Sequence, residues 1–214
     1  MLVNTCVFDA YGTLFDVNAA ARIASNEPNR EIFKDVWPSV SNIWRMKQLQ
    51  YTWLRSMTGS YTDFWSITQN SLDFALEAHK LQNDLVLRER LLALYWELQP
   101  YSEVSQMLKE LKKNGIKTAI LSNGSPEMLN GAVKSSNLYA VIDEIISVET
   151  VKIFKPSSLV YKQVEKIMEC SSLTFYLYRQ MDGILLERQV LVLKLLGLTG
   201  YKNQLTGWPT NQCT

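Results

Sequence analysis

The sequence predicts an α/β fold, with a mostly parallel sheet and a mainly helical segment inserted after its first strand. Short apolar runs at residues 2–8, 117–121 and 142–148 alternate with segments of helical period. Strands that alternate with helices in this way form parallel sheets. The first two runs are separated by an aromatic-rich stretch, residues 17–98, in which the apolar residues recur at helical spacing.

Composition narrows the class of protein. With 214 residues, 47% of them hydrophobic, and a net charge of +1, the chain can bury a core and is not disordered. Lys and Arg total 22 against 21 Asp and Glu, so no basic excess predicts nucleic-acid or membrane-surface binding. The most apolar stretch, 183–200, is interrupted by charges and predicts no membrane span. Three scattered cysteines (Cys6, Cys170 and Cys213) and the lack of a signal peptide predict a cytoplasmic protein.

The first predicted strand, residues 2–8, ends at Asp9 and is followed by a turn that contains glycine. A buried strand of this kind delivers its last side chain to the carboxyl edge of the sheet. Ligands of open α/β proteins bind at that edge. Cys6 lies inside the strand, and we expect it in the core.

The inserted segment, residues 17–98, is expected to form a helical cap over the sheet edge, from which the chain returns near Pro100. Its apolar residues define two faces of the kind that amphipathic helices turn toward a core. The first face is Ile43, Met46, Leu49 and Trp53, and the second is Ile67, Leu72, Ala75 and Leu76.

Strands and helices alternate again after the cap. A helix that Ser102 can cap ends at Gly115, and the strand 117–121 follows. The dipeptide Ser125-Pro126 opens the next helix, because proline is favoured at the first helical position. The strand 142–148 and a helix over 157–168 complete the pattern.

Polar residues lie at three predicted strand ends: Asp9 with Thr13, Ser122 with Asn123, and Lys155. In a parallel sheet the carboxyl ends of the strands share one edge. We therefore expect these side chains to converge beneath the cap.

Three segments that carry these residues resemble the motifs of the haloacid dehalogenase superfamily: FDAYGTL at 8–14, LSNG at 121–124 and KP at 155–156. The match is closest to the L-2-haloacid dehalogenases. Two segments of this chain resemble their pattern almost residue for residue: WRMKQLQYTW at 44–53 and SNGSP at 122–126.

The resemblance runs from about residue 3 to 170. It implies a Rossmann-like core formed by residues 1–16 and 99–214, with a helical cap at 17–98. It also implies the hydrolysis of short L-2-haloalkanoic acids to D-2-hydroxy acids and halide through an aspartyl ester. No cofactor is implied, and the family suggests a homodimer.

The resemblance assigns a role to each matching residue. Asp9 is the nucleophile, Thr13 bonds to it, and Lys155 keeps it ionised and oriented, since a nearby opposite charge favours the carboxylate. Arg45 meets the departing halide or the charge of the substrate, and Tyr161 lies beside the nucleophile. The substrate is bound by Ser122, Asn123 and the backbone N–H groups of Ala10 and Tyr11, in an apolar pocket formed by Tyr11, Leu49 and Phe64.

Tyr11 distinguishes two chemistries. Phosphatases of the superfamily carry a second Asp at this position, which protonates the leaving alcohol, whereas a halide leaves without a proton. We therefore predict a dehalogenase without a metal ion. The alternatives are a phosphatase of the same superfamily and a non-catalytic relic.

The resemblance stops after Cys170. The family pattern implies a further strand and a Ser-Ser-Asn…Asp motif, but residues 173–200 read LTFYLYRQMDGILLERQVLVLKLLGLTG. A shifted reading joins the third base of each codon to the first two bases of the next codon. With suitable synonymous codons for this segment, that reading allows DILSVSSNGWDIAGASGFGFKTAWINR, which resembles the missing segment. We predict a frameshift that begins near residue 171 or 172; the alternative is a divergent C-terminus.

Overall fold

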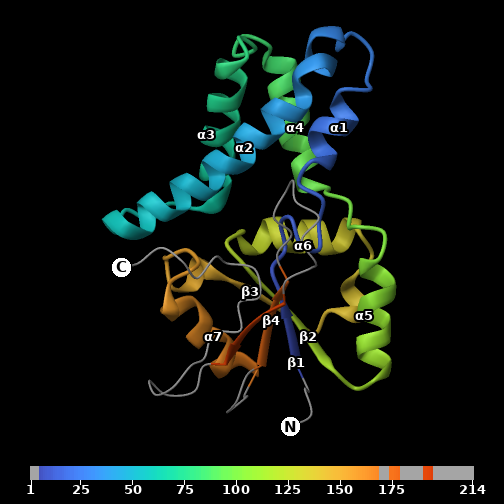
Figure 1. Cartoon of the computed structure of the whole chain (residues 1–214), viewed down its shortest axis with the longest axis vertical. Coiled ribbons are helices and arrows are strands. Elements are labelled where there is room, and N and C mark those ends of the chain that lie inside the picture. Colours follow the sequence, from blue (N-terminus) through green and yellow to red (C-terminus); the bar gives the residue numbers. More distant parts are fainter. Residues whose placement is uncertain (1–4, 169–173, 179–189, 195–214) are drawn as a thin grey trace, which may run out of the picture.

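The computed structural model describes residues 5–168, 174–178 and 190–194. It consists of an α/β core and a group of helices at one end of that core (Figure 1). The predicted α/β class with an inserted helical cap is confirmed.

Three parallel strands form the central sheet in the order β1-β2-β3: β1 (Thr5–Phe8), β2 (Lys117–Ser122) and β3 (Glu144–Ser147). Phe8 pairs with Ile120, so Asp9 leaves β1 level with the last residues of β2. The three predicted strands are confirmed, although the third is shorter than the apolar run 142–148. The sheet core is buried, and Cys6 is only 7% exposed.

Helices α5 (Val104–Lys113) and α7 (Ser158–Met168) flank the sheet on opposite sides, and α6 (Pro126–Ser135) lies toward the cap (Figure 1). Ser125 caps α6 by accepting a hydrogen bond from the Met128 amide at 3.3 Å. The expected cap at Ser102 is wrong. Its hydroxyl donates to the adjacent Glu103 carboxylate at 3.3 Å, and α5 begins without a side-chain cap.

Four helices follow β1 and form the cap: α1 (Ala19–Ala24), α2 (Glu31–Thr58), α3 (Phe64–Ala78) and α4 (Leu85–Trp96). Within the described ranges, no helix is both long enough and apolar enough to span a membrane. The chain enters and leaves the cap through adjacent segments, where Tyr101 N donates to Leu14 O at 3.0 Å and Asp16 N donates to Gln99 O at 2.9 Å.

The face predicted for the long helix α2 is wrong, whereas the face predicted for α3 is confirmed. Met46 is 54% exposed and Trp53 is 42% exposed, while Trp44, Gln48 and Thr52 are buried. These three follow one another at intervals of four residues and so share a helix face. The helix turns polar side chains inward because their hydrogen-bonding groups find partners inside the cap.

A second region of the cap rests on the loop after β3. Phe154 N donates to Ser56 Oγ at 3.2 Å, and the Phe154 ring packs on Tyr61 with centroids 5.0 Å apart. Phe154 also contacts Phe64, at 6.5 Å between centroids. Aromatic side chains therefore join the cap to the core on the side where the core strands end.

Beyond α7, strands β4 (Thr174–Tyr178) and β5 (Val190–Lys194) pair with each other in antiparallel fashion. The predicted start of the frameshift, at residues 171–172, and the third cysteine, Cys213, lie outside the described residues.

Candidate active site

Asp9 and Lys155 meet at the carboxyl edge of the sheet, although they are 146 positions apart in the chain. Lys155 Nζ donates a hydrogen bond to Asp9 Oδ1 and forms an ion pair with it. Thr13 Oγ1 donates to the other oxygen, Asp9 Oδ2, over a longer distance of 3.4 Å. The two charged side chains are only 13% and 12% exposed. Charge-assisted hydrogen bonds in such a poorly hydrated place are strong and directional.

The end of β2 holds Lys155 in this position. Its ammonium group donates to Leu121 O at 2.9 Å, and its backbone N–H donates to Asn123 Oδ1 at 2.9 Å. The predicted convergence is thus observed, but the prediction that Lys155 lies at a strand end is wrong. β3 ends at Ser147, and Lys155 reaches Asp9 from the loop that follows it. The Asn123 side-chain oxygen thus fixes the backbone of the lysine.

Ser122, the last residue of β2, is fully buried. Its Oγ accepts a hydrogen bond from Gly124 N at 3.1 Å, and Ser147 Oγ donates to Gly124 O at 2.7 Å. These bonds order the loop that leads into α6. Ser122 therefore shapes the floor of the site, next to the ion pair.

The turn after Asp9 is tight and brings the cap close to Asp9. Ala10 O accepts hydrogen bonds from the amides of Leu14 and Phe15, at 2.9 and 3.0 Å. Gly12 has φ +83°, a left-handed conformation that favours glycine. Arg45 Nη2, from α2, donates to Tyr11 O at 2.7 Å. The guanidinium of the cap is therefore anchored two residues after Asp9.

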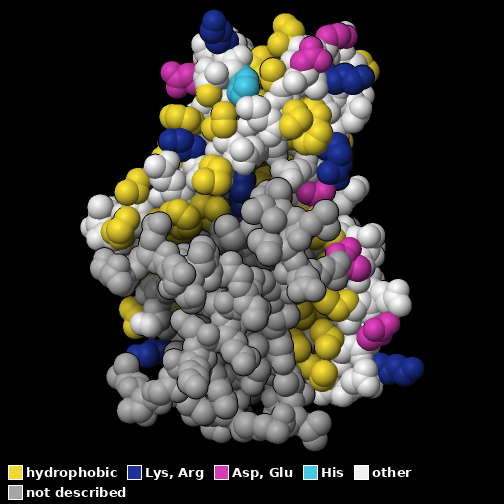
Figure 2. All heavy atoms as spheres, in the orientation of Figure 1, with side chains coloured by type: hydrophobic (Ala, Val, Ile, Leu, Met, Phe, Trp, Pro, Cys, Tyr) yellow, Lys and Arg dark blue, Asp and Glu magenta, His cyan; other side chains and the backbone are white. Residues whose placement is uncertain are grey.

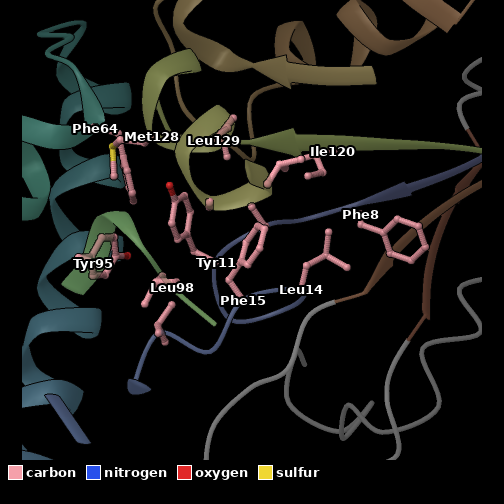
Figure 3. Packing of buried hydrophobic residues seen from close by; sticks show 14 of the residues in the cluster. Phe8, Tyr11, Leu14, Phe15, Phe64, Tyr95, Leu98, Ile120, Met128 and Leu129 are labelled. Carbon is pink, nitrogen blue, oxygen red and sulfur yellow. The ribbon is translucent and has the colours of Figure 1, made fainter. Parts of the chain in front are cut away.

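The Tyr11 side chain inserts into an aromatic cluster of the cap (Figure 3). Its ring stacks on Tyr95 with centroids 5.5 Å apart and an angle of 16° between the ring planes, and it lies 5.7 Å from Phe64. Burial raises the pKa of the Tyr11 phenol well above its usual range, and it also raises the pKa of Tyr95. Both phenols therefore stay neutral, and the wall that they form is apolar.

Leu49 and Tyr161 are placed by their helices and their burial. Leu49 is half-buried on α2, one turn after Arg45, and Tyr161 is buried within α7. Their roles, like those of the other site residues, stay predictions.

Sequence reasoning missed two buried residues of the cap: Tyr95, which stacks on Tyr11, and Gln48, which bonds to the Tyr95 hydroxyl. Gln48 lies inside the segment that resembles the family, three residues after Arg45, and is 1% exposed. Gln48 lies four residues after the apolar Trp44, and residues at this spacing share a helix face. That spacing could have indicated that Gln48 is buried.

Within the part of the chain that the structure describes, no three His, Cys, Asp or Glu side chains gather into a metal-binding group. The Asp9 carboxylate at the strand edge is paired with a lysine.

Replacing Gly124 by alanine is expected to destabilise the protein by about 1–3 kcal/mol, the usual cost of overpacking. A Cβ atom at Gly124 would lie 2.7 Å from Tyr11 Cε2 and 3.2 Å from a methyl group of Leu129. The Tyr11 ring cannot give way easily, because Phe64 and Tyr95 hold it. Urea denaturation measures the change in the free energy of unfolding.

The matched control is Gly131→Ala in α6, where the nearest atoms lie 3.5 Å from the added carbon. This helical substitution should be neutral or stabilising by up to about 1 kcal/mol. Equal stabilities for Gly124→Ala and wild type would contradict the packing argument.

Comparisons with known proteins agree with this geometry. Residues 3–172 match the family model of the haloacid dehalogenase-like hydrolases. (S)-2-haloacid dehalogenase 1 of Pseudomonas sp. (strain CBS-3) is 44% identical over 160 residues, which cover 75% of this chain and 68% of that protein.

Solved structures give the same result. A dehalogenase crystal structure superposes with a TM-score of 0.74 at 37% identity, covering 81% of this chain and 74% of that one. The L-2-haloacid dehalogenase of Xanthobacter autotrophicus with chloropropionic acid covalently bound has a TM-score of 0.69 at 36% identity, covering 79% and 66%. The chain therefore belongs to the haloacid dehalogenase-like hydrolases and is similar to the (S)-2-haloacid dehalogenases.

Proposed function

We propose that the protein hydrolyses short L-2-haloalkanoic acids to D-2-hydroxy acids and halide through an ester on Asp9. The observation that carries the proposal is the contact between Asp9 Oδ1 and Lys155 Nζ beneath a cap that delivers Arg45. Relatives named (S)-2-haloacid dehalogenase, at 36–44% identity, support the reaction class. A haloacetate dehalogenase at 34% identity supports it as well. A neighbouring structure with covalently bound chloropropionic acid supports the ester.

The two oxygens of Asp9 are not equivalent. Oδ1 is engaged by the ammonium group of Lys155, while Oδ2 receives only the long bond from Thr13. We infer that Oδ2 attacks the carbon that bears the halogen. The new O–C bond forms as the C–X bond breaks, and the halide leaves with the bonding electron pair. Attack from the side opposite the halogen inverts that carbon, so an L substrate yields a D product.

The second step releases the product. Water attacks the ester carbonyl carbon of Asp9, and the negative charge that develops on Oδ1 faces Lys155 Nζ. The bond between that carbon and Oδ2 then breaks, and Oδ2 takes one proton of the water and leaves as the hydroxyl oxygen of the product. The second proton of the water passes to solvent. The carboxylate is restored with one oxygen from water.

The positive end of the site is proposed to bind the charges of the substrate. Arg45 forms no ion pair with a carboxylate among the described residues, so its charge is open to an anion, either halide or the substrate carboxylate. The donor groups proposed for the substrate carboxylate are Ser122, Asn123 and the N–H groups of Ala10 and Tyr11, and the proposed apolar wall is Tyr11, Leu49 and Phe64.

A single turnover in ¹⁸O-labelled water tests the ester. With enzyme in excess over L-2-chloropropionate, the released D-lactate should carry ¹⁶O in its hydroxyl group, because that oxygen comes from Asp9. Direct attack of water on the substrate would instead put ¹⁸O in that hydroxyl group and would contradict the ester mechanism. Mg²⁺-dependent release of phosphate from an ester, without halide release, would favour the phosphatase alternative. A chain active on neither substrate would favour the relic.

The assay should compare the chain as written with a frame-restored chain. We propose that the C-terminus is frameshifted from about residue 171, and that the missing segment helps place halide and water. Sequencing the gene across this region decides the point, since an intact reading frame contradicts it. Frame-restored protein should then turn over faster than the chain as written.

We also propose a cytoplasmic homodimer that does not bind nucleic acid. Apolar side chains lie among charged ones on the outer surface of the cap (Figure 2). Those on α2 and α3 that are at least 40% exposed are Ile32, Met46, Trp53, Leu54, Met57 and Phe74. Exposed apolar surface of this kind favours association. Sedimentation at twice the mass of the chain is the expected result; the monomer mass would contradict it.

A further inference from the structure

The cap contains a buried polar network centred on Gln48, behind the wall of the site. Gln48 Nε2 donates to Thr68 Oγ1 at 2.9 Å and to the Tyr95 hydroxyl at 3.1 Å. Thr68 in turn donates to Phe64 O at 2.8 Å. One amide therefore ties α2 to α3 and to α4, and its side chain is 1% exposed.

A glutamine in this place has an energetic cost. Burying an amide is unfavourable unless its donors and acceptor are all bonded, and an apolar side chain of the same size would fill the space without that requirement. Here the bonds are made, and a satisfied buried network fixes one arrangement of the helices that share it. Gln48 therefore holds the three cap helices at a definite separation.

That separation reaches the reacting groups through Tyr95. The Tyr95 ring packs on Trp44 at 5.0 Å and stacks on Tyr11 at 5.5 Å, and Tyr11 contacts Phe64 on the cap as well. Figure 3 shows Tyr11 between the cap residues and the first turn of α6. Because Tyr11 follows Asp9 by two residues, a shift of its ring moves the turn that carries the nucleophile.

Gln48 also shares a helix with the cation of the site. Arg45 lies three residues earlier on α2, so the two side chains are neighbours along the helix. Arg45 Nη2 donates to Tyr11 O at 2.7 Å. Movement of α2 relative to α4 would therefore change the Arg45 contact and the Tyr11 contact together.

We propose that Gln48 is a positioning residue: it sets the place of Tyr95 and thereby fixes Tyr11, Arg45 and the nucleophile turn relative to one another. It acts without touching the substrate. The proposal deepens the proposed dehalogenase function and rests on it for its kinetic readout. Its main consequence is that substrate selectivity depends on a buried amide of the cap.

Gln48→Leu tests the proposal, because leucine has a similar size and no hydrogen-bonding group. The expected result is a fall of about tenfold in kcat/KM for L-2-chloropropionate, since small displacements of reacting groups carry large kinetic costs. The ratio of kcat/KM for L-2-chloropropionate to that for chloroacetate should also change, because the wall formed by Tyr11 moves.

Two further variants separate positioning from general stability. Ser71→Ala removes another fully buried hydrogen bond of the cap, from Ser71 Oγ to Ile67 O at 2.7 Å, which lies within α3 and joins no second helix. It should lower Tm and leave the selectivity ratio as in wild type. Tyr95→Phe keeps the ring but loses the hydroxyl. If Gln48 acts through that hydroxyl, adding Tyr95→Phe to Gln48→Leu should cause no further loss of activity.

Near-ultraviolet circular dichroism gives a readout that needs no turnover. Gln48→Leu should change the aromatic signal of the stacked Tyr11, Tyr95 and Trp44 rings while the far-ultraviolet spectrum stays the same, and Ser71→Ala should change neither. A Gln48→Leu protein with lower Tm but wild-type selectivity and aromatic signal would overturn the proposal, as would additive effects of the two substitutions. A wild-type chain that releases no halide would refute the proposed function alone, since the spectra still report positioning.

Discussion

Replacing Asp9 with alanine is expected to lower the rate of halide release from L-2-chloropropionate by at least about 10⁴-fold. The variant has no oxygen that can attack the carbon bearing the halogen, so the ester cannot form. The rest of the site remains: Arg45 keeps its contact with Tyr11 O at 2.7 Å, and Lys155 keeps its bond to Leu121 O at 2.9 Å. Binding without turnover is the expected state of this variant.

Halide release, followed with an ion-selective electrode, measures the effect. Asp35→Ala is the matched control, because Asp35 is an exposed carboxylate on α2. It should release halide at the wild-type rate. Thermal unfolding of both variants establishes that they fold. Turnover by Asp9→Ala within tenfold of wild type would show that another group, or water itself, performs the displacement.

The polar strand ends were predictable from sequence because they depend on a simple rule. Parallel strands end at one edge of the sheet, so Asp9 and Ser122 had to converge once the strands were placed. Lys155 reaches the same edge from the loop after β3, where it contacts Asp9 and bonds to Leu121 O. The sequence therefore predicted which residues meet, although not which oxygen of Asp9 the lysine engages.

The cap was predicted less well, because burial of polar side chains depends on partners that the sequence does not reveal. Gln48 and Thr52 look like surface residues, while Met46 and Trp53 look like core. The structure reverses these assignments, since α3 and α4 supply the groups that bond Gln48. Hydrophobic periodicity predicts the buried face of a helix when that face is apolar. It does not predict a buried face whose polar groups bond to neighbouring helices.

Aromatic contacts join the cap to the chain segments of Asp9 and Lys155. Tyr11 reaches into the cap, and Phe154, next to Lys155, packs on Tyr61 and Phe64. Each member of the ion pair therefore has a neighbour in the chain that is held by the cap. This arrangement explains why a helical insertion, far from the strands in sequence, can control the geometry of Asp9 and Lys155.

Lys155→Met is expected to slow turnover by about 10³-fold, and mainly in the second step. The first step needs a carboxylate oxygen, and Oδ2 of Asp9 stays available beside Thr13. The second step places negative charge on Oδ1 when water attacks the ester, and Lys155 Nζ is the donor at that atom. Loss of such a donor costs 10²–10³-fold or about 3–4 kcal/mol in acyl-transfer sites, and the loss of a charged donor belongs at the upper end of that range.

The distinctive consequence is a trapped ester. Mixing Lys155→Met with L-2-chloropropionate should give a rapid burst of halide, about one per active site, followed by slow release. Intact mass spectrometry should then show the chain with the substrate's propionate group attached, and peptide mapping should locate that group on Asp9.

Lys162→Met, on the exposed surface of α7, is the control and should show steady wild-type release. Slow halide release without a burst would instead place the main role of Lys155 in the first step, where it orients the carboxylate that attacks. Such a result would remove Lys155 from the oxyanion role while leaving the Asp9 ester intact, because the two steps use different oxygens of the same carboxylate.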